Sequence, residues 1–121
     1  MQEQVGQAEA VVGEYLQRIR QGKLQATYGL TAPEFRRRTP LKVHVRFSRL
    51  LLRSLQRYPE PVVTDRRIGI DPASPHVKLT YRVGPEWKAA PLIFYVVPIG
   101  DKWYVSSIHF DAGKHSKIER T

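Results

Sequence analysis

The segment RRRTPLKVHVRFSRLLLRSLQR, residues Arg36 to Arg57, decides how the rest of the chain is arranged. From Pro40 onward it has helical periodicity. The basic side chains that follow Pro40 fall within a sector of roughly 80° on a helical projection. This part of the segment is therefore predicted to be a helix with one core side and one basic side. The apolar far side consists of Phe47, Leu51 and Leu55, predicted to point inward, with Val43, Leu50 and Tyr58.

The charge of the chain is concentrated in this segment. It holds eight of the 20 basic residues and none of the 11 acidic ones, so the remainder of the chain has a net charge of only +1. We call the basic side chains of the predicted helix the basic ridge: Lys42, Arg46, Arg49, Arg53 and Arg57. Three preceding arginines extend it: Arg36, Arg37 and Arg38. Such a surface favours an anionic partner, although a basic helix face can also be merely solvated.

Helical patterns also precede this segment. Residues 3–21 show apolar residues at helical spacing, and Gly22 is the expected C-cap. A short helix is predicted over residues 24–30, with Ala26, Tyr28 and Leu30 inward. Two helix starts follow, with Thr31 and then Thr39 as N-caps.

After Pro61 the apolar period changes from helical to alternating. Strands are predicted at residues 62–70, 76–83, 87–99 and 103–110, the third of them covered on both faces. Trp87 and Trp103 are expected in the core. A β-bulge at Ser106–Ser107 is predicted because it would bring Trp103, Val105, Ile108 and Phe110 to one side. Asp71 to Pro75 mark a turn. The fold class is thus α+β, with N-terminal helices packed on a curved, mainly antiparallel four-stranded sheet.

Length and composition limit the other options. A chain of 121 residues is expected to form one domain, 1–121, with a loosely ordered tail at 111–121. It contains no cysteine, and no run of about 18 apolar residues predicts a membrane span. His44, His76, His109 and His115 have no metal-ligand spacing, so neither a metal nor another cofactor is expected.

Several residues carry a family resemblance. The first helix has Ala8, Tyr15, Leu16, Ile19 and Gly22, followed by Ala26, Tyr28 and Phe35, and the last strand reads GDKWYV from Gly100. This pattern resembles small bacterial members of unknown function in the NTF2-like, cystatin-like superfamily. The resemblance implies a curved sheet wrapped around the long helix and enclosing a conical cavity. It also implies dimerisation through the sheet as an option, and export or membrane tethering of the domain in many relatives.

Three functional hypotheses remain open. The first is a non-catalytic binding module with an unknown protein or anionic partner. The second is a small-ligand binder or ketosteroid-isomerase-like enzyme with its site in the cone, which the resemblance implies; Asp65 and Asp71 are the nearby acids, but no catalytic residue can be assigned. The third is a binder of nucleic acid or acidic membrane surfaces. For the cone, the candidate ligand-binding residues are Tyr15, Tyr28, Tyr95 and His109.

Overall fold

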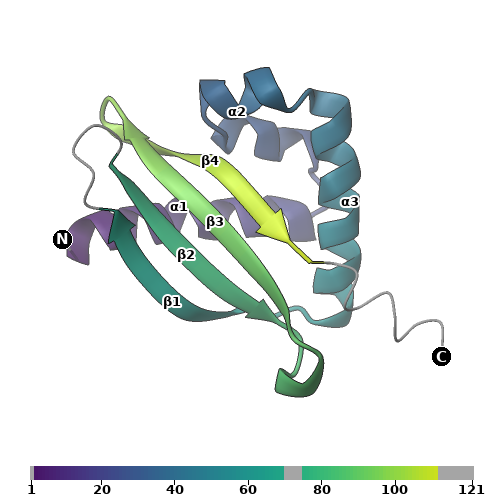
Figure 1. The fold of residues 1–121 in the computed structure, drawn as a ribbon. Coiled ribbons are helices and arrows are strands. Elements are labelled where there is room, and N and C mark those ends of the chain that lie inside the picture. Colours follow the sequence, from purple (N-terminus) through teal and green to yellow (C-terminus); the bar gives the residue numbers. More distant parts are fainter. Residues whose placement is uncertain (1, 70–74, 112–121) are drawn as a thin grey trace.

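A computed structural model describes residues 2–69 and 75–111 and confirms the α+β class. Helices precede a four-stranded antiparallel sheet whose strands follow one another in sequence order, β1-β2-β3-β4 (Figure 1). α2 sits beside β4, and α3 stands across one end of the sheet (Figure 1). The expected turn residues 71–74 and the tail residues 112–121 lie outside the described residues.

The first helix, α1, spans Gln2–Arg20 and ends as the sequence predicts. Gly22 has a positive φ of 75°. This left-handed conformation favours glycine. The Gly22 N–H donates to the carbonyl of Ile19, and the N–H of Lys23 donates to that of Arg18, at 2.9 Å each. These two bonds form a Schellman motif, so the predicted C-cap is confirmed.

The next helices are η1 (Gln25–Leu30), α2 (Pro33–Arg38) and α3 (Leu41–Arg57). Ala26 of η1 is exposed and Thr27 is buried, so the inward position predicted for the alanine is wrong. The tighter turn of a 3₁₀ helix changes which side chains face the core.

Both predicted threonine caps are also wrong, because Ala32 and Pro40 occupy the N-cap positions and make no side-chain cap bond. Thr31 instead ends η1. Its hydroxyl donates to the carbonyl of Tyr28 at 2.6 Å, and its backbone bridges to β4 at Val105.

The strands are β1 (Val62–Gly69), β2 (His76–Val83), β3 (Ala90–Ile99) and β4 (Lys102–Phe110). A single turn of 3₁₀ helix, η2 (Glu86–Lys88), precedes β3. The alternation predicted for β2 is confirmed, since every second residue from Val77 to Val83 is buried. β3, however, is buried on only one face, so the prediction of full coverage is wrong. Its second face carries Ile93, Tyr95 and Val97, which are half-buried.

A β-bulge in β4 confirms the prediction at the two serines. Tyr95 pairs with Ser107 while Val96 pairs with Val105, so Ser106 is the extra residue. The side-chain alternation of β4 changes at this point. Trp103 and Val105 before the bulge, and Ile108 and Phe110 after it, therefore all pack against the same core.

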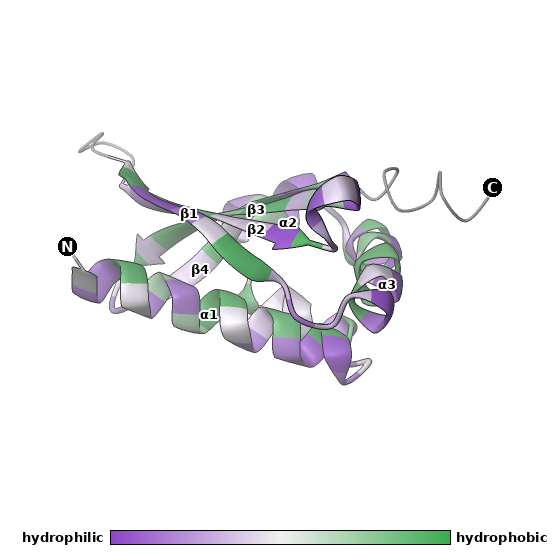
Figure 2. Cartoon of the chain, turned by 90° about the horizontal axis from the view of Figure 1, so that it is seen from below, coloured by the Kyte–Doolittle hydropathy of each residue, from purple (hydrophilic) through white to green (hydrophobic). Residues whose placement is uncertain are grey.

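The core lies between α1 and one face of the sheet, and α3 closes it at one end (Figure 2). Its largest fully buried side chains include Tyr15 of α1, Phe94 of β3 and Leu51 of α3. The opposite face of the sheet, which we call the outer face, is not covered by α1 (Figure 2). The long helix thus occupies one side of the sheet and leaves side chains of β2, β3 and β4 available on the other.

Candidate functional site

The basic ridge is exposed along the whole of α3. Within residues 2–69 and 75–111, four of its members make no ion pair: Lys42, Arg46, Arg49 and Arg53. The helix buries its other side, where Leu51 and Leu55 contact the core as predicted. The ridge is therefore a surface feature that the packing of α3 does not use.

The three arginines before α3 behave differently from one another. Arg37 forms an ion pair with Glu34 at 3.1 Å. Arg38 donates to the carbonyl of Ser106 at 2.8 Å and so connects α2 to the bulge of β4. Arg36 is exposed, and its carbonyl accepts a hydrogen bond from Tyr28. The extension of the ridge thus includes one arginine with a structural contact.

The rotation of α3 differs from the prediction. Val43 and Leu50, expected on the apolar far side, are each 46% exposed, whereas His44 and Ser48 are buried. The buried line of the helix runs through His44, Ser48, Leu51 and Leu55, because that line faces α1 and η1. As a result, Val43 and Leu50 border the basic ridge with aliphatic surface.

His44 is the most unusual buried side chain. The Thr27 hydroxyl donates to the carbonyl of Leu24 at 2.7 Å, and its oxygen lies 2.8 Å from His44 Nε2. Since that hydroxyl proton is already used, we assign the imidazole proton to Nε2, which donates it to Thr27; the Tyr15 hydroxyl lies 3.4 Å from the same nitrogen. Nδ1 then lacks a hydrogen, and among the described residues it has no partner. Burial lowers the pKa of His44 to about 4, so the ring is neutral at neutral pH.

The predicted cavity residues are not brought together. Tyr15 lies in the core, and burial raises the pKa of its hydroxyl. Tyr28 has a structural role, because its hydroxyl lies 2.7 Å from the Thr39 carbonyl and 3.0 Å from that of Arg36. Only Tyr95 and His109 share one surface, the outer face, with ring centroids 6.0 Å apart.

The expected conical cavity is filled by core side chains between α1 and the sheet. No carboxylate is among the buried polar residues in the part of the chain that the structure describes. Those residues are Thr27, Thr31, His44, Ser48, Ser54 and Lys88. Asp65 forms an exposed ion pair with Arg67 on β1, and Asp71 lies outside the described residues. These observations give no support to the isomerase-like hypothesis.

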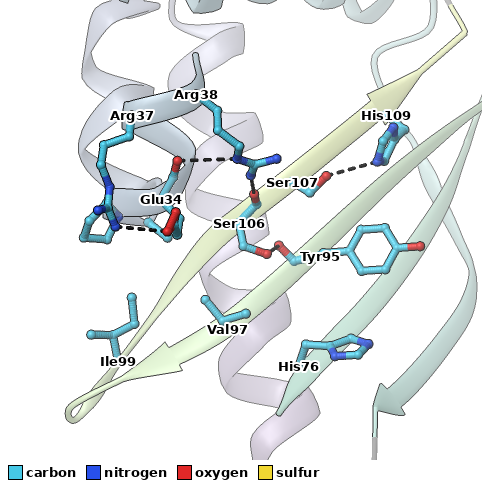
Figure 3. A pocket seen from close by; sticks show the side chains of 12 residues that line it. Glu34, Arg37, Arg38, His76, Tyr95, Val97, Ile99, Ser106, Ser107 and His109 are labelled. Atoms are coloured by element: carbon cyan, nitrogen blue, oxygen red, sulfur yellow. Dashed lines mark hydrogen bonds and ion pairs between the residues drawn. The ribbon is translucent and has the colours of Figure 1, made fainter. Parts of the chain in front are cut away.

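A pocket of about 800 Å³ does exist, but it lies on the outer face of the sheet beside α2 (Figure 3). Its floor is formed by Tyr95, Val97 and Ile99 of β3, with His76 and His109 on either side of the Tyr95 ring. The bulge contributes two hydroxyls: that of Ser106 donates to the Tyr95 carbonyl, and that of Ser107 lies 3.0 Å from His109 Nε2. α2 supplies the wall: Pro33, Glu34, Arg37 and Arg38.

Sequence reasoning missed most of this pocket. The sequence does not group His76 and the α2 residues with Tyr95, because their proximity depends on how α2 packs beside β4. One signal was available in the alternation of β2. Val77 and Leu79 point into the core, so His76 must point to the outer face together with Lys78, which pairs with Tyr95 of β3.

Trp87 is 77% exposed, so its expected place in the core is wrong. It belongs to η2, whose short turn lies outside the sheet ladder. Trp103, by contrast, packs against the core and donates to the Gln7 side chain at 2.8 Å.

A scan against models of protein families finds no match to the chain, and a search of curated proteins finds none either. The superfamily assignment therefore stays a proposal.

None of the helices in residues 2–69 and 75–111 combines the length and the apolarity needed to cross a membrane.

Proposed function

We propose that this chain is a binding module of NTF2-like architecture that contacts an anionic macromolecule through the basic ridge. The architecture is supported by the element order, with α1 lying along one face of a meander of four antiparallel strands. The single observation that carries the function is the row of four exposed cations on α3 that form no ion pair within the described residues. A fold alone does not define a partner, so the proposal depends on this surface.

Geometry makes the ridge suitable for an extended anionic surface. Lys42 and Arg53 are eleven residues apart in the sequence. At the rise of an α-helix this separation corresponds to a length of roughly 16 Å. Arg46 and Arg49 lie between them on the same side. Because residues 42–53 include no acid, the field along the row has one sign. Arginine side chains can pair with carboxylate, phosphate or sulfate groups.

The test is retention on immobilised heparin, a polyanion, for two variants of equal net charge. Arg49→Glu with Arg53→Glu changes the ridge, whereas Arg67→Glu with Lys102→Glu changes exposed residues of the sheet region. Two reversals, of two charge units each, lower the net charge from +9 to +5 in both variants. We expect the ridge variant to bind roughly tenfold more weakly and with a shallower salt dependence. Equal weakening in both variants would show that net charge, and not the ridge, determines binding.

Dimerisation through the sheet and export of the domain remain predictions from the superfamily resemblance. Tyr95, Val97 and Ile99 give the outer face an apolar strip that a second copy could cover. Sedimentation equilibrium at high protein concentration tests this directly. A monomer throughout the concentration range would exclude the dimer.

A further inference from the structure

We propose that the pocket between α2 and the outer face binds a small organic anion with an apolar ring body, such as an aromatic carboxylate. In this arrangement the ring body covers Val97 and Ile99, and the anionic group pairs with Arg37. This site is separate from the basic ridge and does not depend on it. It also lies on the opposite side of the sheet from the filled cone (Figure 3).

The size and position of the pocket suit a small molecule. Its volume is about 800 Å³. This value falls within the range that is usual for ligand sites. The core lies on the other face of β3, so a ligand can enter without moving a core side chain. The wall is anchored, because Arg38 bonds to Ser106 and Ala32 N–H donates to the Val105 carbonyl at 2.8 Å.

The floor explains the apolar part of the ligand. Ile99 is 44% exposed and Val97 is half-buried. A bound ring would therefore remove aliphatic surface from water. The Tyr95 ring also belongs to the floor. Two imidazole rings contact it in tilted or edge-on orientations, with centroid distances of 5.9 Å to His76 and 6.0 Å to His109. Rings and aliphatic side chains with only a few polar groups are the usual lining of a small-molecule site.

The wall explains the charge of the ligand. Arg38 donates to backbone carbonyls, whereas Arg37 has, among the residues that the structure describes, only an exposed ion pair with Glu34. Exposed ion pairs contribute little, so exchanging this one for a bidentate bond to a ligand carboxylate, partly shielded by the pocket, is favourable. Glu34 competes for the same guanidinium. Its neutralisation should therefore strengthen binding of an anion, while loss of Arg37 should weaken it.

Two fluorescent probes of nearly the same shape test the proposal with the full chain. Anilinonaphthalene sulfonate carries one negative charge, and phenylnaphthylamine is the same ring system without the sulfonate. We expect the folded protein to bind the sulfonate more tightly than the uncharged probe, and naphthoate to displace it. Arg37→Gln should weaken sulfonate binding by about fivefold and leave the uncharged probe unchanged, whereas Glu34→Gln should strengthen sulfonate binding.

Two further variants locate the probe. Ile99→Asp places a charge on the floor at an exposed position and should weaken both probes, with its thermal unfolding midpoint showing that the fold is kept. The ridge variant Arg49→Glu with Arg53→Glu should bind the sulfonate as the unmodified chain does. The proposal is overturned if neither probe binds, if Arg37→Gln and Glu34→Gln have no effect on sulfonate affinity, or if the ridge variant alone loses it.

Discussion

Acidification should destabilise this protein through His44. The imidazole is fully buried and is surrounded by the rings of Tyr15, Tyr28, Phe35 and Phe47, with centroids 5.3 to 6.4 Å away. None of these neighbours is an acid that could balance a positive charge. Protonation would therefore place an uncompensated cation in the core, at an Nδ1 that lacks a partner in the described part of the chain.

The size of the effect follows from linkage between proton binding and folding. The pKa of His44 is lowered from 6.5 to about 4 in the folded state. The unfolded chain therefore binds more protons between these values. The free energy of unfolding must then fall as the pH decreases through this window, and His44 has no further effect below it. The loss is about 2 kcal/mol between pH 7 and pH 5, and roughly 3 kcal/mol in total.

Urea unfolding at a series of pH values measures this loss. The matched variant is His44→Gln, because a glutamine amide can donate to Thr27 but does not titrate. The variant should be less stable at neutral pH, since its shape differs from that of the imidazole. Between about pH 7 and pH 5, its free energy of unfolding should nevertheless decrease by about 2 kcal/mol less than that of the unmodified chain.

The free energy of unfolding is plotted against pH for both proteins, and the difference between the two curves isolates the contribution of His44, because all other titrating groups are common to both. Parallel curves would show that His44 has the same pKa in the folded and unfolded states, and the argument from burial would then be wrong. NMR titration provides an independent check. The ring resonances of His44 should not shift until the pH approaches the lowered pKa of about 4.

Changes at three other positions test the fold. Deleting Ser106 should convert the bulge into a regular ladder in which Val105 and Ile108 still face the core, so chemical denaturation should show a loss of only about 2 kcal/mol from the two hydrogen bonds of Ser106, and Ser106→Ala should keep the bulge and cost about 1 kcal/mol. A much larger loss after the deletion, as expected if Ile108 and Phe110 left the core, would contradict the register. Leu51→Ala should destabilise the protein by roughly 3 kcal/mol because the side chain is fully buried, and a loss below about 1 kcal/mol would show that α3 is not firmly docked. Gly22→Ala should lower the thermal midpoint, since the positive φ costs alanine about 1 kcal/mol, and an unchanged midpoint would argue against the left-handed cap.

Local chemistry was sufficient to predict the elements and one irregularity of the sheet. Proline and glycine positions and the change of apolar period indicated where helices and strands lie, and Gly22 indicated how α1 ends. The bulge could be inferred because only an extra residue lets Val105 and Ile108 face the same core. In each case the deciding signal lies within a few residues of the feature.

Features that depend on contacts between distant segments were not predictable in the same way. A helical projection puts Val43 and Leu50 on the apolar side, but α3 instead buries His44 and Ser48, because Thr27 and Tyr15 offer polar partners there. The pocket has the same origin, since only tertiary packing brings α2 next to the outer face of β3. Sequence reasoning could place Tyr95 and His109 on one face but not the wall that faces them.

The run of like charges that organises the sequence therefore has two distinct roles. Arg38 stabilises the junction of α2 and β4 through the Ser106 carbonyl, whereas Arg49 and Arg53 form no ion pair among the described residues. Reversing charge at Arg49 and Arg53 should weaken heparin binding while leaving the unfolding midpoint unchanged, but loss of Arg38 should change stability. Because α3 is held by Leu51 and Leu55 on its opposite side, binding and folding can be separated experimentally on this one helix.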